Sequence, residues 1–262
     1  MLRLQVLTFN IRTATGRDGP DRWRRRRDVA AGVLRRADVA GVQEARSQQL
    51  TDLTLGAPGH RWFGRGRADG HRGGEHVPVF WRADRFVCVD RGVFWHSGTP
   101  DVPGSRDHER AITRMATWVR LAERSSGQPV FVLNTHLDHR VPEARLGATD
   151  QIRAEVDRRA GSDPVIVTGD LNDRPGSPPY QRLTDGDGRV RLIDTRTAAP
   201  MRLGPETTLH GFGPVKPGVY IDHVLVSPHW QVERSTVEPD RIDGRFPSDH
   251  CPVFVDLALP SA

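Results

Sequence analysis

Acidic and amide side chains follow a run of β-branched residues in the segment VIVTGDLNDRPGSP (165–178). The apolar run predicts a buried strand, which ends at Asp170, Asn172 and Asp173 before Pro and Gly break the chain. Because Asp170 and Asn172 are two residues apart, an extended backbone would point both side chains the same way. Such a strand end suits catalytic groups, but a polar loop after a core strand has the same composition. The interpretation therefore depends on the other strand ends.

Four further strand ends carry groups of the same kind. They are TFNIR with Asn10, GVQEA with Glu44, NTHLDH with Asn134, His136, Asp138 and His139, and PSDHCPV with Asp249 and His250. The segment YIDHVLV adds Asp222 and His223 within or near a strand. Each group alone has a structural explanation, since SDH is common in turns and a histidine after a strand is often a hydrogen-bonded core residue. Their recurrence at the ends of apolar runs favours one shared site.

These residue types suit a divalent cation and a general base. Mg²⁺ prefers oxygen ligands, usually one or two carboxylates, with water and substrate phosphate completing the shell. Glu44 is the candidate for the main carboxylate, with Asn10 and Asp249 supporting the metal or its waters. His250 is a candidate base provided that a buried carboxylate fixes its tautomer, and Asp222 is the candidate for that carboxylate. Asn and His side chains also donate to phosphoryl oxygens as charge builds there.

The composition is that of a globular protein of 262 residues, 36% hydrophobic and 27% charged. No apolar run approaches the roughly 20 residues that cross a bilayer. The start, MLRLQVLTFNIR, is typical of a strand and not of a secretory leader, which predicts a cytoplasmic location. Cys88 and Cys251 are far apart and have no neighbours at zinc-finger spacing, so neither a disulfide framework nor a structural zinc site is expected.

The formal net charge is +5, and all but one of the 38 basic residues are arginines. They are scattered along the chain except in RWRRRRD (22–28). This run is either a polyanion-binding patch or the solvated face of a helix, since Val29, Gly32, Val33 and Arg36 follow at helical spacing. Both interpretations stay open at this point.

Apolar patterning predicts about ten strands and three or four helices. The expected strands are 3–11, 39–44, 77–82, 86–95, 112–122, 129–137, 164–169, 219–227, 230–240 and 251–259, and the expected helices are 22–36, 45–55 and 142–160. Residues 185–218 are weakly patterned. Strands both follow one another and alternate with helices, which predicts an α/β chain of two packed mixed sheets with helices outside.

The motifs LTFNIR, QE, NTHLDH, GDLND, IDHVLVS and SDHCPV, in that order, resemble the endonuclease/exonuclease/phosphatase superfamily of deoxyribonuclease-I-like metal-dependent phosphoesterases. That superfamily includes nucleases, inositol-polyphosphate 5-phosphatases, deadenylases and neutral sphingomyelinases. The resemblance runs from residue 3 to residue 257, and the ordered set is specific although no single motif is. It implies a four-layer α/β/β/α sandwich, a single domain over 1–262, and Mg²⁺- or Mn²⁺-dependent hydrolysis of phosphoesters.

The resemblance also implies roles for the residues nearest the expected metal. Asn10 and Glu44 match the metal-site Asn and Glu of the family, and Asp249 matches the acidic residue beside the metal. His250 matches the catalytic histidine and Asp222 its carboxylate partner, with His223 following where many relatives have tyrosine. The implied mechanism is in-line attack by water that His250 activates.

Further matches concern the phosphate. Asp170 and Asn172 match the pair that handles the nucleophile and the phosphate, and Asp170 shares the base role in some accounts of the family. His136 matches the second histidine, and GEHVPVFWR resembles the segment that supplies that histidine's partner, here Glu75. Arg114 lies where relatives often place a phosphate-contacting arginine, although an outward-facing strand arginine fits the sequence equally well.

The substrate is open among three interpretations. The favoured one is a small phosphorylated metabolite such as a sugar phosphate, nucleotide or phospholipid headgroup, hydrolysed by a monomer. In that case Asp138, His139, Arg145 and His210 either line a small pocket or only stabilise loops. The second is a nuclease that holds nucleic acid with the segment RWFGRGRADGHR (61–72). The third is an inactive binding module, which the complete set of metal and base residues disfavours.

Overall fold

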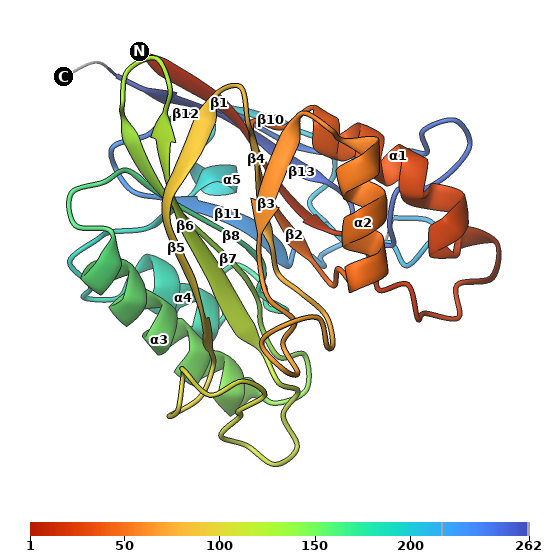
Figure 1. Cartoon of the computed structure of the whole chain (residues 1–262), viewed down its shortest axis with the longest axis horizontal. Coiled ribbons are helices and arrows are strands. Elements are labelled where there is room, and N and C mark those ends of the chain that lie inside the picture. The colour runs from red at the N-terminus through yellow and green to blue at the C-terminus, as the bar shows by residue number, and fades with distance from the viewer. Residues whose placement is uncertain (216, 261–262) are drawn as a thin grey trace.

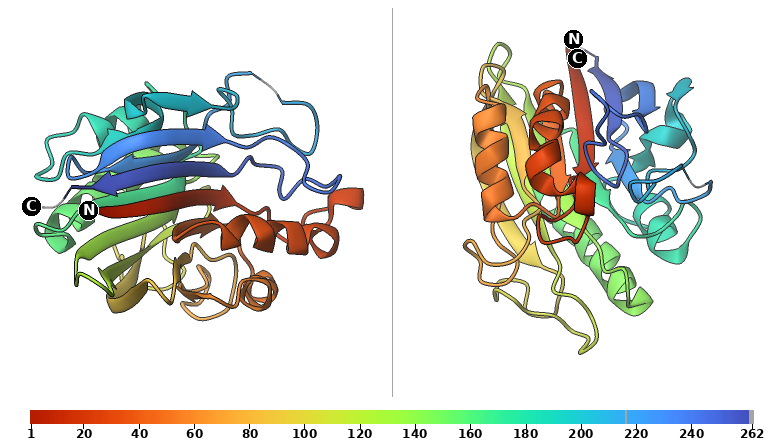
Figure 2. Two further views of the ribbon diagram at one scale, coloured as in Figure 1. Left: turned by 90° about the horizontal axis from the view of Figure 1, so that it is seen from above. Right: turned by 90° about the vertical axis from the view of Figure 1, so that its right-hand side faces the viewer.

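The computed structural model describes residues 1–215 and 217–260, so Lys216 and the last two residues lie outside the described part. Two β-sheets pack face to face, and helices cover both outer faces (Figure 1; Figure 2). This arrangement confirms the predicted α/β/β/α sandwich. Among the helices in the described residues, none combines the length and the apolar character that a bilayer crossing requires.

The first sheet has seven strands in the order β10-β12-β13-β1-β2-β4-β3. Their bounds are Met201–Leu203, Gln231–Val237, Val253–Leu259, Leu2–Asn10, Val39–Gln43, Val79–Arg82 and His60–Phe63, respectively. Strands β1 and β2 are parallel, whereas β13 lies antiparallel to β1. Helices α1 (Trp23–Arg35) and α2 (Ser47–Gly56) cover the outer face, and a short 3₁₀ turn, Gly19–Asp21, precedes α1.

The second sheet has six strands in the order β5-β6-β7-β8-β11-β9. Their bounds are Phe86–Trp95, Met115–Glu123, Pro129–His136, Val165–Asp170, Asp222–Val226 and Ile193–Asp194, respectively. Strands β7 and β8 are parallel, and β11 runs antiparallel to β8. Helices α3 (Pro142–Arg159) and α4 (Pro178–Thr184) cover the outer face, and α5 (Thr195–Ala198) follows β9.

Both faces of the central strands are buried, which explains their nearly continuous apolar sequences. In β1, Leu4 and Val6 belong to the cluster between the sheets, whereas Leu7 and Phe9 belong to the cluster under α1 and α2. Phe131 of β7 faces the third cluster, under α3 and α4. Burying each such side chain stabilises the fold by about 1.5–3 kcal/mol, so a change such as Phe131→Ala would cost about 3–5 kcal/mol.

The two parallel pairs end at one edge of the sandwich. Asn10 pairs with Gln43 at the last position of β1 and β2, and His136 pairs with Asp170 at the last position of β7 and β8. Asp170 also lies opposite Asp222, the first residue of β11. The strand register therefore brings residues from distant parts of the sequence to one place.

Several elements differ from the sequence expectations. The weakly patterned stretch 185–218 contains β9, α5 and β10, and the Pro-rich segment after β8 forms α4. This helix begins where Ser177 Oγ accepts the N–H of Tyr180 and two prolines occupy the first turn. The strand expected at 112–122 begins only at Met115, because the backbone of Ile112 bonds to a side chain instead of a neighbouring strand.

The arginine-rich run 22–28 forms the first turns of α1 but is not one solvated surface. Arg24 and Arg25 are exposed, whereas Arg26 is buried at 1% exposure. The Arg26 guanidinium donates to the carbonyl oxygens of Ile11, Pro247 and Arg12, next to the strand end that carries Asn10. Arg26 is therefore part of neither a polyanion-binding patch nor a solvated helix face. Its hydrogen bonds connect helix α1 to two loops.

Candidate active site

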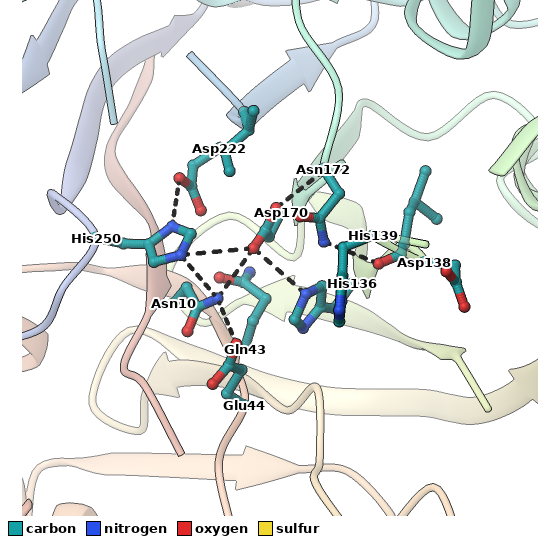
Figure 3. Close-up of polar contacts among 12 residues, drawn as sticks. Asn10, Gln43, Glu44, His136, Asp138, His139, Asp170, Asn172, Asp222 and His250 are labelled. Carbon is teal, nitrogen blue, oxygen red and sulfur yellow. Dashed lines mark hydrogen bonds and ion pairs between the residues drawn. The ribbon is translucent and has the colours of Figure 1, made fainter. Parts of the chain in front are cut away.

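Polar side chains from both sheets converge on Asp170, at the end of β8 (Figure 3). Asp170 Oδ2 accepts a hydrogen bond of 3.0 Å from Asn10 Nδ2. The same oxygen lies 3.3 Å from His136 Nε2 and 3.9 Å from His250 Nε2. Asn10 Nδ2 also lies 3.2 Å from Glu44 Oε1. The structure thus brings together five of the residues that the sequence motifs single out.

His250 lies just before β13 and is held by Asp222, with 2.8 Å between His250 Nδ1 and Asp222 Oδ2. Burial alone would lower the pKa of His250, but the carboxylates of Asp222, Asp170 and Asp249 outweigh burial and raise it well above its usual value. The pairing fixes the ring so that Nε2 faces Asp170 and Asn10. His250 therefore presents one ring nitrogen to the site for proton transfer.

Asp170 is buried among other acids. Burial and the charge of Asp222 raise the pKa of Asp170 to about 7, although His250 and Asn10 act in the opposite direction. Its second oxygen, Oδ1, accepts the backbone N–H of Asn172 at 2.9 Å. A carboxyl group with this pKa can hold or release a proton near neutral pH, so Asp170 is suited to base chemistry.

Glu44 occupies a tight turn directly after β2. Its φ of 62° is unusual for a residue with a side chain, and the turn directs the carboxylate toward Asn10. Glu44 Oε2 accepts the N–H of Thr13 at 2.8 Å. Burial opposes ionisation of Glu44, but His250, the Thr13 N–H and Asn10 together outweigh burial and lower the pKa. Glu44 is therefore ionised at neutral pH.

Asp249 completes the acidic surroundings of His250. Its Oδ1 accepts the Ser248 hydroxyl at 3.2 Å, and its Oδ2 lies 3.7 Å from Arg12 Nε. Burial, together with the nearby charge of Glu44, raises the pKa of Asp249 although His250 lowers it. The crowding of negative charge is thus relieved only in part by the chain's own cations.

The donor set fits a hard divalent cation. Ligand atoms of Asp170, Asp222 and His250 lie within 4.8 Å of one another, and all three residues are buried. Asp222 Oδ1 is buried without a hydrogen-bond partner in the described residues. A cation would relieve the repulsion that raises the pKa of Asp170. This cluster differs from the predicted ligands Glu44, Asn10 and Asp249. The amide of Asn10 connects Glu44 to Asp170, and Asp249 precedes His250 in the sequence.

His136 has a defined tautomer because Arg114 lies against it. Arg114 Nη1 is 2.9 Å from His136 Nδ1, and a guanidinium can only donate, so Nδ1 is the acceptor. The ring proton is therefore on Nε2, which lies 3.3 Å from Asp170 Oδ2. Burial and the positive charge of Arg114 lower the pKa of His136, so it is a neutral donor. Arg114 is 6% exposed, and the alternative of an outward-facing strand arginine is wrong.

Glu75 lies behind Arg114 and not at a ring nitrogen of His136. Its Oε2 is 2.5 Å from Arg67 Nη1 and 3.7 Å from Arg114 Nη1. The spacing of GEHVPVFWR led to the expectation that Glu75 bonds to the histidine. The guanidinium of Arg114 takes that place, so Glu75 acts on His136 only through Arg114.

The chain turns sharply after Asp170, which changes the position of Asn172. Asn172 has a φ of 49°, so the prediction of two parallel side chains on an extended backbone is wrong. Asn172 Nδ2 donates to the carbonyl of Leu137 at 3.0 Å, while its backbone N–H bonds to Asp170. Asn172 thus joins the loop after β7 to the carboxylate of Asp170.

The residues expected to line one small pocket lie in two places. Asp138 accepts the backbone N–H groups of Ile112, Arg140 and Val141. Arg145 bonds to the Asp138 carbonyl at 2.8 Å and to Asp173 Oδ2 at 2.9 Å, and His139 Nδ1 lies 3.4 Å from Arg114 Nη2. His210, by contrast, packs on Phe246 with 4.3 Å between ring centroids, and Leu209 next to it forms a β-bridge with His250.

A polar layer between the sheets supports the site from below, and the sequence reasoning missed it. Gln43 Nε2 donates to Asn134 Oδ1 at 2.7 Å and to Thr8 Oγ1 at 3.1 Å. Asn134 Oδ1 also accepts from Thr168 at 3.1 Å. A Cβ on Gly41 would lie 1.9 Å from Thr168 Oγ1, so only glycine fits. The available signal was the position of Gln43 and Asn134 within the motifs GVQEA and NTHLDH.

A model of the endonuclease/exonuclease/phosphatase family matches residues 7–250. The chain is similar to an endonuclease/exonuclease/phosphatase from Bacteroides vulgatus, with 30% identity, coverage of 99% of this chain and 100% of that one, and a TM-score of 0.94. A family protein from Bacteroides thetaiotaomicron has 32% identity, 98% coverage of both chains and a TM-score of 0.91.

A mannosyl-6-phosphatase from Bacteroides thetaiotaomicron VPI-5482 is also similar. The identity is 32%, the coverage is 98% of this chain and 100% of that one, and the TM-score is 0.90. A comparison with curated proteins finds no match. The family match spans nearly the whole chain, and its last residue is His250 in the cluster described above. The chain therefore belongs to the endonuclease/exonuclease/phosphatase family.

Proposed function

We propose that this protein is a divalent-metal-dependent phosphoesterase that hydrolyses the phosphate ester of a small phosphorylated metabolite by in-line attack of water. The observation that carries the proposal is the arrangement around Asp170. A histidine held by a carboxylate and two neutral donors meet at one buried carboxyl group, and one of these donors, Asn10, also bonds to an ionised glutamate. Phosphoryl transfer by water needs a base, donors to the phosphoryl oxygens and a site for a cation.

The base is the pair formed by His250 and Asp170. Asp222 holds Nδ1 of His250, so Nε2 is the nitrogen that exchanges a proton with the attacking water. Asp170 Oδ2 lies 3.9 Å from this nitrogen, and its pKa of about 7 lets it share the proton. Asn172 orients Asp170 through its backbone N–H. Both assignments of the primary base, to His250 or to Asp170, are compatible with this geometry.

The donors are Asn10 and His136. Asn10 Nδ2 and the protonated Nε2 of His136 lie 3.0 and 3.3 Å from Asp170 Oδ2. A phosphoryl oxygen between these two groups would accept a hydrogen bond from each as its charge develops. Arg114 keeps the proton of His136 on Nε2 and adds positive charge behind it. Glu44, Asn10 and Asp249 would hold the cation, whose charge offsets that of the phosphoryl and leaving oxygens.

A small substrate is favoured over nucleic acid. The mannosyl-6-phosphatase that resembles this chain is named for a phosphorylated sugar. In the segment 61–72, proposed above as a nucleic-acid contact, the aromatic rings have partners within the protein. Trp62 donates to Thr54 at 2.9 Å and packs on Phe80, and Arg91 lies 4.8 Å from the centre of the Phe63 ring. Rings that are engaged in this way are poorly placed to stack on bases.

The test is a hydrolysis screen with added Mg²⁺ or Mn²⁺ over sugar phosphates, nucleotides, bis(p-nitrophenyl) phosphate, sphingomyelin, and plasmid and abasic DNA. We expect turnover of a sugar phosphate that EDTA abolishes, with a shallow dependence on salt. Glu44→Gln should lower turnover by orders of magnitude and weaken Mn²⁺ binding in calorimetry, whereas Gln48→Glu on the exposed surface of α2 is the control. Undiminished hydrolysis in EDTA would refute the metal dependence, and cleavage of DNA alone with steep salt dependence would favour the nuclease.

A further inference from the structure

An open cavity of about 760 Å³ lies beside the candidate active site. Three segments form it: the loop after β3, the long loop between β5 and β6 at the lower end of the molecule in Figure 1, and the turn after β7. Its charged lining residues are Arg67, Arg106, Arg110, Arg140 and Glu109. Four guanidinium groups thus surround a space that contains one carboxylate.

Asp138 builds the wall of this cavity. Its Oδ2 accepts the N–H of Ile112 at 2.5 Å, and its Oδ1 accepts the N–H groups of Arg140 and Val141 at 2.5 and 2.9 Å. All three of these partners line the cavity. Asp138 is 3% exposed and stands two residues after His136. The same strand end therefore supplies a donor to the active site and the acceptor that holds the two loops together.

Arg67 provides a second connection to the active site. It lines the cavity, and it also lines a narrow space together with Glu44 and His136. Its guanidinium is fixed by the 2.5 Å contact with Glu75, which lies 3.7 Å from Arg114 Nη1. The cavity and the narrow space beside His136 therefore share Arg67 as a lining residue.

The remaining three arginines have no acidic partner. Arg106, Arg110 and Arg140 are exposed, and their guanidinium groups make no ion pair or hydrogen bond with any residue that the structure describes. An abundance of arginine is not evidence by itself in this chain. Several exposed arginines elsewhere, such as Arg174 and Arg202, also lack an acidic partner in the described residues, so what distinguishes these three is that they line one cavity together with Arg67. Positive charge is therefore left over in this cavity.

We propose that this cavity binds a second anionic group of the substrate, a phosphate or a carboxylate on the same small molecule as the scissile phosphate. The inference rests on the proposed function and narrows it to sugar bisphosphates and phosphorylated sugar acids. Guanidinium groups bind both kinds of anion through paired, charge-assisted hydrogen bonds.

The test is calorimetric binding to the full-length protein in EDTA, where the proposed hydrolysis cannot occur. Matched ligands are a hexose 6-phosphate, the hexose 1,6-bisphosphate and the 6-phosphohexonate. We expect at least one two-anion ligand to bind about tenfold or more tightly than the monophosphate. The triple variant Arg106→Gln/Arg110→Gln/Arg140→Gln should reduce this ratio to about one. The control Arg202→Gln, an exposed arginine of β10, should leave the ratio unchanged.

Equal binding of the one- and two-anion ligands, or no binding of either, would overturn the proposal. A tenfold preference that survives in the triple variant would overturn it as well, because the second anion would then lie elsewhere. If the protein bound only short oligonucleotides, and if this binding required the three arginines, the proposed ligand of the cavity would be a nucleic acid and not a small molecule. Binding is measured without metal and does not depend on hydrolysis. If the protein hydrolysed no substrate in the screen, the proposed function would be refuted, but the binding ratio would still test the second anion site.

Discussion

Two aspartate–histidine pairs meet at adjacent residues of β11. Asp222 holds His250 at 2.8 Å, and the next residue, His223, is held by Asp194 at 3.0 Å. Both histidines are buried, and carboxylates raise the pKa of both although burial alone would lower it. Neighbouring residues of a strand point to opposite faces of the sheet, so one pair lies at the candidate active site and the other on the opposite face of the sheet.

The pairs differ at the second ring nitrogen. His250 Nε2 faces the side chains of Asp170 and Asn10, whereas His223 Nε2 donates to the backbone carbonyl of Asp173 at 3.2 Å. With acceptors at both nitrogens, His223 is doubly protonated and holds the loop that follows β8. A carboxylate behind a histidine is therefore not by itself a sign of catalysis, and we expect the partner of the other ring nitrogen to distinguish a catalytic pair from a structural one.

The largest expected effect comes from removing the reactive histidine. His250→Ala should lower turnover by about 10²–10⁴-fold, because general base catalysis contributes that much. The fold should survive, as judged by circular dichroism and a cooperative unfolding transition, although the free energy of unfolding should fall because the Asp222 carboxylate loses its only side-chain hydrogen bond in the described residues. Near-normal turnover of the substrate found in the screen would contradict the assignment of His250 to the active pair.

His223→Ala should lower the stability of the protein without a comparable loss of turnover. The change leaves the carboxylate of Asp194 buried without its cation, which typically costs about 3–5 kcal/mol. We expect the free energy of unfolding, measured with urea, to fall by about 3–5 kcal/mol. Turnover, measured under conditions in which the variant is still folded, should fall by less than about tenfold. A variant of normal stability with strongly reduced turnover would mean that the two pairs are not separate in function.

This comparison also shows how far the sequence could predict the site. Asp222 and His250 lie in ordered motifs at the ends of apolar runs, so their convergence and the two-sheet fold were predictable. Asp194 lies in the stretch 185–218, which has no clear periodicity, so nothing in the sequence connected it with His223. The order of the motifs indicates which strand ends lie close together. It does not identify hydrogen-bond partners, such as Asp194, that lie in weakly patterned segments.

Contacts that depend on turn geometry or on other side chains were equally hidden. The position of Asn172 follows from a φ of 49°, which its sequence neighbours did not indicate. The tautomer of His136 depends on the guanidinium of Arg114 at 2.9 Å, a contact between neighbouring strands. Asp138 looks like a site residue in the motif NTHLDH, yet its oxygens bind backbone N–H groups of two loops. The roles of these residues in catalysis stay predictions.

The pH dependence of stability sharpens the comparison further. Burial would lower the folded-state pKa of His223, but the Asp194 carboxylate and the Asp173 carbonyl outweigh burial and raise this pKa. The protonated His223 therefore contributes its full stabilisation below about pH 6.5, and this stabilisation is lost as the pH rises through the folded-state pKa. Burial opposes ionisation of Asp194, but the hydrogen bond to His223 outweighs burial and lowers the pKa of Asp194. The stabilisation that the Asp194 carboxylate contributes is therefore present above about pH 3.9 and is lost as the pH falls through the folded-state pKa.

The unfolding free energy of the parent minus that of His223→Gln should therefore be largest between about pH 4 and pH 6.5 and should shrink toward pH 9. Urea unfolding at fixed ionic strength across this range measures the difference. His108→Gln, a change at an exposed histidine, is the matched control and should give a nearly flat line. A difference that grows with pH would show that His223 is neutral in the folded protein.

The smallest expected effect comes from the third partner of the structural pair. Tyr180 donates its hydroxyl to Asp194 Oδ2 at 3.0 Å, on the same oxygen that His223 approaches. Tyr180→Phe should lower the unfolding free energy by about 1 kcal/mol and leave turnover unchanged, because His223 still pairs with Asp194. In a double-mutant cycle with His223→Gln, the two changes should couple, since they share one acceptor. Strict additivity would mean that Asp194 is not the common centre of this pair, and a marked loss of turnover would mean that the outer layer contributes to catalysis.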